Sequence, residues 1–124
     1  MNQKKPIFLD LWRLQFPPMA IVSILHRISG VFLFLALPAL LYVLALSLRS
    51  PADFAQALTL LKQPYWCMGI WAFAVALFYH SIAGIRHIVM DLGFGESLGA
   101  ARVSAYLVLA LSVVFAIIVG CCLC

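Results

Sequence analysis

The chain has 124 residues, of which 66% are hydrophobic and 10% are charged, and its mean hydropathy is +1.12. A soluble domain of this length needs far more polar surface to cover its core, so the composition excludes that class and indicates an integral membrane protein. The formal net charge is +4, but the basic residues flank apolar segments and form no stripe, which argues against nucleic-acid binding.

The first part of the chain is typical of an interfacial segment, which we place at residues 1–22. Aromatic and aliphatic residues alternate with Asp10 and Arg13 between positions 6 and 16, as in segments that lie at the headgroup level. A proline pair follows, and because proline is tolerated in the first turn, we expect a helix to begin at about Met19.

Three later windows contain no Lys, Arg, Asp or Glu: Ile28–Leu48, Gln63–Ile85 and Val103–Cys124. At about 1.5 Å of rise per residue, each is long enough to cross a hydrocarbon core of about 30 Å. The sequence therefore predicts an all-α integral membrane fold. We expect one membrane domain, residues 1–124, with transmembrane helices at about 23–48, 64–90 and 102–124.

The first window starts too far into the chain, and is too long, for the apolar region of a secretory signal peptide. The start MNQKKPIF also lacks the Arg- and Ser-rich character of an organelle import sequence, so we expect a multi-pass protein of a bacterial inner membrane. Basic residues favour the cytoplasmic side, which predicts a cytoplasmic N-terminus and an outer C-terminus. On the predicted cytoplasmic side are Lys4, Lys5, Arg13, Arg27, Arg86 and Arg102, against Arg49 and Lys62 on the other.

The connection after the first span contains a helix-start pattern. Pro38 lies within the span itself and predicts a kink. Beyond it, Ser50 is placed as an N-cap, with Pro51 in the first turn and Asp53 at the third position. We expect a short amphipathic helix on the outer surface, with Phe54, Leu58 and Leu61 as its apolar positions.

The second connection contains Gly93, Gly95 and Ser97, which predict a tight turn. The span that follows has no polar residue stronger than Ser112, so we expect a scaffold helix. The cysteines, at positions 67, 121, 122 and 124, lack the paired spacing of a zinc site, and we treat them as small apolar side chains without a role.

The second span places a histidine on a face of small residues. At about 100° per residue, His80, His87 and Asp91 lie on one side of the helix, with Ala76 and Gly84 one turn away from His80. An ionisable group inside a span is a functional candidate. Two interpretations fit: close helix packing with one interhelical hydrogen bond, or a flat cofactor whose iron takes the imidazole as axial ligand.

The start of the first span carries a second polar face. Ser23, His26, Arg27 and Gly30 are related by spacings of three, four and seven residues, so they share one side of a helix. Arg27 and His26 could simply reach toward lipid headgroups. That interpretation leaves the hydroxyl and the glycine on the same face unexplained, and a guanidinium beside imidazoles can also bind an anion.

These two faces carry a resemblance to a known family. SILHRISG, residues 23–30, resembles the S-I-x-H-R-x-[ST]-G motif of the cytochrome b membrane-anchor subunit of succinate dehydrogenase, its C subunit. The residues from His80 to Gly93 resemble the second signature of that family, and the resemblance covers nearly the whole chain. At the front, KPIFLDL replaces the R-P-x-S-P-H-L of many members and is closer to the bacterial version.

The resemblance implies a subunit that is part of an enzyme complex and is not catalytic alone. It would pair with a second small membrane subunit in a helical bundle, share one b haem with it, and anchor an iron–sulfur subunit and a flavoprotein subunit. The match makes His80 the axial ligand of the haem iron. It makes Ser23 and Arg27 quinone-binding residues, and His26, Arg27, Arg86 and His87 neighbours of the haem propionates. Since no second histidine lies deep in a span, the other haem ligand would come from the partner, and ubiquinone would receive electrons from the iron–sulfur subunit.

Two alternatives stay open at this point. One is a small oligomeric transporter or channel subunit that uses His80 and Arg27 to pass protons or anions. The absence of a carboxylate within the predicted spans makes a proton-coupled transporter less favourable. The other is an anchor that recruits cytoplasmic subunits and binds no cofactor.

Overall fold

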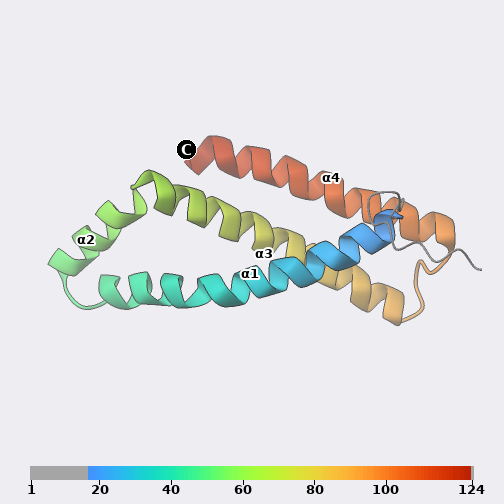
Figure 1. Cartoon of the computed structure of the whole chain (residues 1–124), viewed down its shortest axis with the longest axis horizontal. Helices are drawn as coiled ribbons and strands as arrows, with labels where there is room; N and C mark the ends of the chain where they lie inside the picture. The colour runs from blue at the N-terminus through green and yellow to red at the C-terminus, as the bar shows by residue number, and fades with distance from the viewer. Residues whose placement is uncertain (1–16, 124) are drawn as a thin grey trace, which may run out of the picture.

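The computed structural model describes residues 17–123, which form four helices and, within that range, no strand. The helices are α1 (Pro18–Ser47), α2 (Pro51–Leu61), α3 (Pro64–Asp91) and α4 (Leu98–Leu123). The three long helices run lengthwise, and the short α2 joins α1 to α3 at one end (Figure 1).

The long helices have the length and composition of membrane spans. Their most apolar windows have mean hydropathies of 2.4 in α1, 1.6 in α3 and 2.8 in α4. The prediction of an all-α fold with three transmembrane helices is confirmed. The predicted interfacial segment falls mostly on residues 1–16, outside the described range, and its last residues belong to α1.

The helix starts follow local capping chemistry. Pro17 caps α1 and Pro18 takes its first position, close to the predicted start. At α2 the Ser50 hydroxyl accepts a hydrogen bond from the backbone N–H of Asp53 at 3.1 Å, so the predicted cap is confirmed. Pro38 lies inside α1, which stays helical from Pro18 to Ser47.

The short helix α2 packs against α1 through Ala57. Ala57 is only 2% exposed and packs against Val43 and Leu46 of α1. Of the apolar positions predicted for this helix, Leu61 packs against the same cluster, and Phe54 and Leu58 are 51% and 43% exposed, so they remain available to lipid. A small side chain occupies the contact position because it lets the short helix approach α1 closely.

The turn between α3 and α4 is confirmed, and α4 begins at Leu98. Gly93 and Gly95 have φ angles of 94° and 69°, in the left-handed region that glycine adopts without a steric cost. The backbone oxygen of Ser97 then accepts from the N–H of Ala101 at 2.8 Å, so the helix is already formed when it reaches Arg102. The membrane span was predicted from about residue 102, and the helix itself begins four residues earlier, since an arginine does not interrupt a helix.

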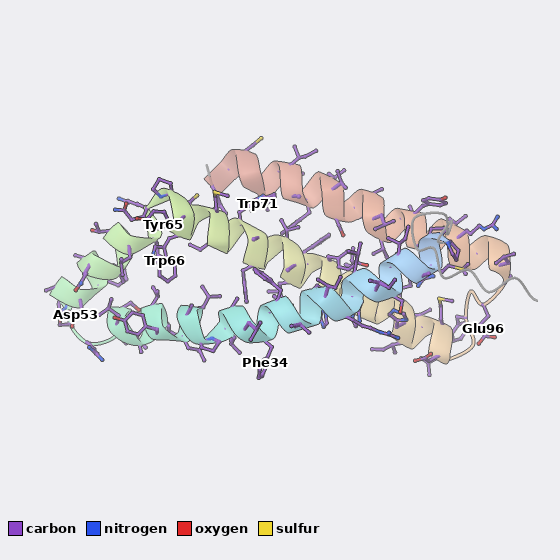
Figure 2. The ribbon with its side chains drawn as sticks, viewed as in Figure 1. Phe34, Asp53, Tyr65, Trp66, Trp71 and Glu96 are labelled. Atoms are coloured by element: carbon purple, nitrogen blue, oxygen red, sulfur yellow. The ribbon has the colours of Figure 1, made fainter. Side chains whose placement is uncertain are left out.

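The core is small and lies where the three long helices meet. It consists of Val22, Tyr79, Ala83, Ala105 and Val108. Most large apolar side chains point outward instead, as in Figure 2, where Phe34 projects from α1 and is 76% exposed. An apolar exterior of this kind suits a helix surrounded by lipid or by other membrane helices. Toward the α2 end, α1 and α4 diverge (Figure 1).

Candidate functional site

The three histidines of the chain gather between α1 and α3. The rings of His26 and His80 are stacked, with centroids 4.1 Å apart and an angle of 7° between their planes. His87 lies beside His26, with a centroid distance of 5.3 Å and a tilt of 59°. Within residues 17–123, no group of three or more His, Cys, Asp or Glu side chains could hold a bare metal ion. The histidine cluster is therefore not a ready-made site for a metal ion alone.

Two glycines make the close approach of the rings possible. A Cβ atom on Gly30 would lie 3.1 Å from Cε1 of His80, and one on Gly84 would lie 3.3 Å from Nε2 of His26. Each glycine thus accommodates the imidazole of the opposite helix. The sequence had placed Gly84 beside the histidine of its own helix, whereas its contact is with His26 across the interface.

His80 is oriented by contacts on one of its two ring nitrogens. Its Nδ1 lies 3.1 Å from Oγ of Ser29 and 3.2 Å from the backbone oxygen of His26. No buried side-chain nitrogen or oxygen in the described part of the chain lacks a hydrogen-bond partner. Since Nε2 of His80 has no partner there, this nitrogen keeps accessible surface and can meet a ligand.

Ser29 was not among the site residues predicted from the sequence. It is 8% exposed, and its hydroxyl lies in the contact between α1 and α3. Its spacing of three residues from His26 was a usable signal, since it places both side chains on the α3-facing side of α1.

Ser23 and Arg27 lie on α1 within one turn of His26. Arg27 is exposed and Ser23 is half-buried. Neither side chain forms a hydrogen bond with any residue in the range 17–123, so the guanidinium and the hydroxyl remain open to an external partner. An open guanidinium beside an open hydroxyl can stabilise negative charge on an oxygen.

Arg86 is placed differently from the prediction. It is 8% exposed, its Nε donates to Oγ of Ser104 at 2.9 Å, and its Nη2 donates to the backbone oxygen of Ala101 at 3.0 Å. These contacts point the guanidinium toward α4, away from the histidine cluster, because adjacent helix positions differ by about 100°. The placement gives no support to Arg86 as a propionate neighbour. It identifies Ser104, which was not among the predicted site residues, as the partner of Arg86.

An apolar groove of about 500 Å³ lies between α1, α3 and α4. Its α1 wall contains Leu25, Ile28 and Phe32, which lie on the opposite side of that helix from Ser23 and Arg27 at about 100° per residue. The groove is therefore distinct from the polar face at the start of α1.

The four polar side chains in the groove wall all bond to backbone oxygens. Tyr79 Oη donates to the carbonyl of Val22 at 2.6 Å, and Trp71, between α3 and α4 in Figure 2, donates through Nε1 to Ala116 at 2.8 Å. The hydroxyls of Ser29 and Ser112 each donate at 2.8 Å to a carbonyl of their own helix. The wall presents no free donor from these groups, so we do not place a polar ligand there.

The chain matches a known family over most of its length. Residues 1–119 match the family described as succinate dehydrogenase/fumarate reductase transmembrane subunit. A relative from Coxiella burnetii, named succinate dehydrogenase cytochrome b556 subunit, is 44% identical over 121 residues, which cover 97% of each chain. The protein of the same name from Paracoccus denitrificans is 31% identical over 92% of this chain and 88% of its own. The cytochrome b560 subunit of Reclinomonas americana is 32% identical over 95% and 85% of the two chains.

These matches agree with the family that the two sequence motifs indicated, and they do not support the transporter or channel alternative. The chain is a membrane-anchor protein of the family of succinate dehydrogenase/fumarate reductase transmembrane subunits.

Proposed function

We propose that this chain is the cytochrome b anchor of a succinate:quinone oxidoreductase in a bacterial inner membrane, with its N-terminus in the cytoplasm. It holds one b haem together with a second membrane subunit and forms part of a ubiquinone site. It anchors the iron–sulfur and flavoprotein subunits and is catalytic only within that complex. The observation that carries the proposal is His80, inside α3, with Nδ1 hydrogen-bonded and Nε2 accessible.

The residues present fit a haem. An imidazole whose Nδ1 is hydrogen-bonded offers the lone pair of Nε2 to iron, and this arrangement is usual for metal-bound histidine. The rings of His26 and His87 and the open guanidinium of Arg27 are the groups available for the haem carboxylates. When bound, the haem supplies a one-electron redox centre.

The partner must supply the second axial ligand in this proposal. An imidazole binds iron along its own ring plane, but His26 lies against the face of the His80 ring, 4.1 Å away. His26 therefore cannot bind the same iron from the opposite side. His87 is about 10 Å along the helix from His80. A histidine or equivalent ligand from a second membrane subunit would complete the coordination.

Replacement of His80 tests the haem assignment. In the complex purified from its own membrane, we expect His80→Ala to abolish or alter the b-type reduced-minus-oxidised spectrum. Ser81→Ala is the matched control, because Ser81 is adjacent, exposed and bonded only to Leu77 of its own helix. An unchanged spectrum in His80→Ala would refute the assignment, and a colourless wild-type complex with its soluble subunits attached would favour an anchor without a cofactor.

Ser23 and Arg27 are proposed to bind the quinone headgroup. Reduction of a quinone develops negative charge on its carbonyl oxygens, and a fixed hydroxyl and a guanidinium stabilise that charge most in a site that excludes water. We expect Arg27→Ala and Ser23→Ala to lower succinate:quinone activity by about 100-fold or more, the scale of losing one such donor.

The control for this test is electron transfer from succinate to an artificial dye, which should survive in both variants. Arg49→Ala, in the turn beyond the opposite end of α1, should leave both activities unchanged. Equal loss of both activities in the Arg27 variant would mean failed assembly and would remove the support for a quinone role.

A further inference from the structure

Ser29 connects three groups at the α1–α3 interface. Its hydroxyl donates to the backbone oxygen of His26 at 2.8 Å, and the same oxygen atom, Oγ, lies 3.1 Å from Nδ1 of His80. Nδ1 in turn lies 3.2 Å from the oxygen of His26. The side chain is 8% exposed, so water competes little for these contacts.

The donors and acceptors in this triangle determine where the His80 proton resides. A serine has one hydrogen to donate, and Ser29 gives it to the carbonyl of His26, so its oxygen faces His80 as an acceptor. The carbonyl of His26 can only accept. With two acceptors within 3.2 Å, Nδ1 of His80 must be the donor, because an unprotonated Nδ1 would set its lone pair against that carbonyl.

A neutral imidazole with its proton on Nδ1 has its lone pair on Nε2. We propose that Ser29 is a positioning residue that holds His80 in this tautomer and orientation and, through the added hydrogen bond, sets the donor strength of Nε2 toward haem iron. This inference rests on the proposed role of His80 as the axial ligand. Hydrogen bonds to the distal nitrogen of a metal-bound imidazole raise its basicity.

The role of Ser29 differs from that of Ser112, the other buried serine whose hydroxyl donates to a carbonyl of its own helix. Ser112 of α4 is also 8% exposed, and its hydroxyl also donates to a carbonyl of its own helix, that of Val108 at 2.8 Å. Only Ser29 of the two adds a contact to an imidazole. Ser112→Ala is therefore a control for the loss of a buried hydroxyl that has no connection to His80.

The test is a potentiometric titration of the haem in the complete complex with Ser29→Ala, Ser29→Thr and Ser112→Ala. Loss of the Ser29 acceptor makes Nε2 less basic, which disfavours the oxidised iron and raises the potential. We expect Ser29→Ala to raise the ratio of reduced to oxidised haem at a fixed potential by about threefold, or about 28 mV for a one-electron couple. Ser29→Thr keeps the acceptor and should match Ser112→Ala, whose potential should equal that of the wild type.

A Ser29→Ala potential equal to that of Ser112→Ala would overturn the inference. If Ser29→Ala does not assemble, Ser29→Cys replaces it, because a thiol of similar size is a weaker acceptor and should give a smaller shift in the same direction. A wild-type potential in Ser29→Cys would overturn the inference equally.

The spectrum of His80→Ala separates this inference from the function on which it rests. If that variant retains an unchanged haem spectrum, the ligand assignment fails and the role of Ser29 falls with it. If it loses the spectrum while Ser29→Ala titrates like Ser112→Ala, only the role of Ser29 is overturned.

Discussion

Tyr79 of α3 donates its phenolic proton to the backbone oxygen of Val22 in α1, with an oxygen–oxygen distance of 2.6 Å. Both residues are buried, and Val22 is fully enclosed. The bond lies one turn before His26 on α1 and next to His80 on α3. It therefore fixes the longitudinal register of the two helices at the point where the histidines must meet.

Removal of this bond should destabilise the helix pair. We expect Tyr79→Phe to lower the stability of the purified complex by about 0.5–2 kcal/mol, the net value of one hydrogen bond in a protein or a membrane interior. The loss of stability is measured by thermal unfolding of the complex, followed by loss of the visible spectrum. Tyr106→Phe is the control, because Tyr106 is 60% exposed on α4. A thermal unfolding midpoint of Tyr79→Phe equal to that of Tyr106→Phe would contradict the prediction.

An added methyl group at Gly30 should disturb the ring of His80. The new Cβ would lie 3.1 Å from Cε1, so the imidazole has to move by a few tenths of an ångström. We expect Gly30→Ala to change the haem spectrum or to lower the haem content of the complex. Gly69→Ala, in α3 with open space around the added Cβ, should leave the spectrum unchanged and favour the helix by about 1 kcal/mol.

Loss of the Arg86 side chain should weaken the contact between α3 and α4 and leave the haem unaffected. Its guanidinium bridges to Ser104 and Ala101, and we expect Arg86→Met to cost about 1–3 kcal/mol, since it removes two hydrogen bonds to a charged donor. Thermal stability and the haem potential are measured on the same samples, with exposed Arg102→Met as control. A shifted potential with unchanged stability would favour the propionate role that the sequence predicted.

Loss of the Ser50 cap should destabilise α2 and leave the neighbouring helices unchanged. We expect Ser50→Ala to lower the protection of α2 amides from hydrogen exchange by about 1 kcal/mol, because the N–H of Asp53 loses its acceptor. Ser47→Ala removes a hydroxyl that bonds only within α1, to Leu44, and should leave α2 unchanged. Equal protection in the two variants would show that packing of Ala57, and not the cap, holds this helix.

The helices could be predicted because their determinants are local. Long apolar windows, the Ser50 cap and the glycines of the turn each act over a few residues. The predicted span at about 102–124 and helix α4 begin at different residues, because absence of charge marks the lipid-embedded part and not the whole helix. The packing face of α2 could not be found from its own sequence, because Ala57 is selected by the surface of α1.

The site was only half predictable for a related reason. Spacing along one helix placed His26 with Arg27 and His80 with His87. It gives no information on how one helix is rotated against another. That rotation decides that Gly30 faces His80, that Ser29 bonds to the same ring, and that Arg86 turns to α4.

The buried guanidinium of Arg86 also limits how deep the protein can sit in the bilayer. Only two of the five N–H donors of an arginine are occupied by the bonds to Ser104 and Ala101. The others require water or headgroup oxygens, which the hydrocarbon core does not supply. Arg86 lies about 7 Å from the end of α3. We therefore expect this end of the α3–α4 pair to project into the headgroup layer, which would set the height of the histidine cluster relative to the membrane surface.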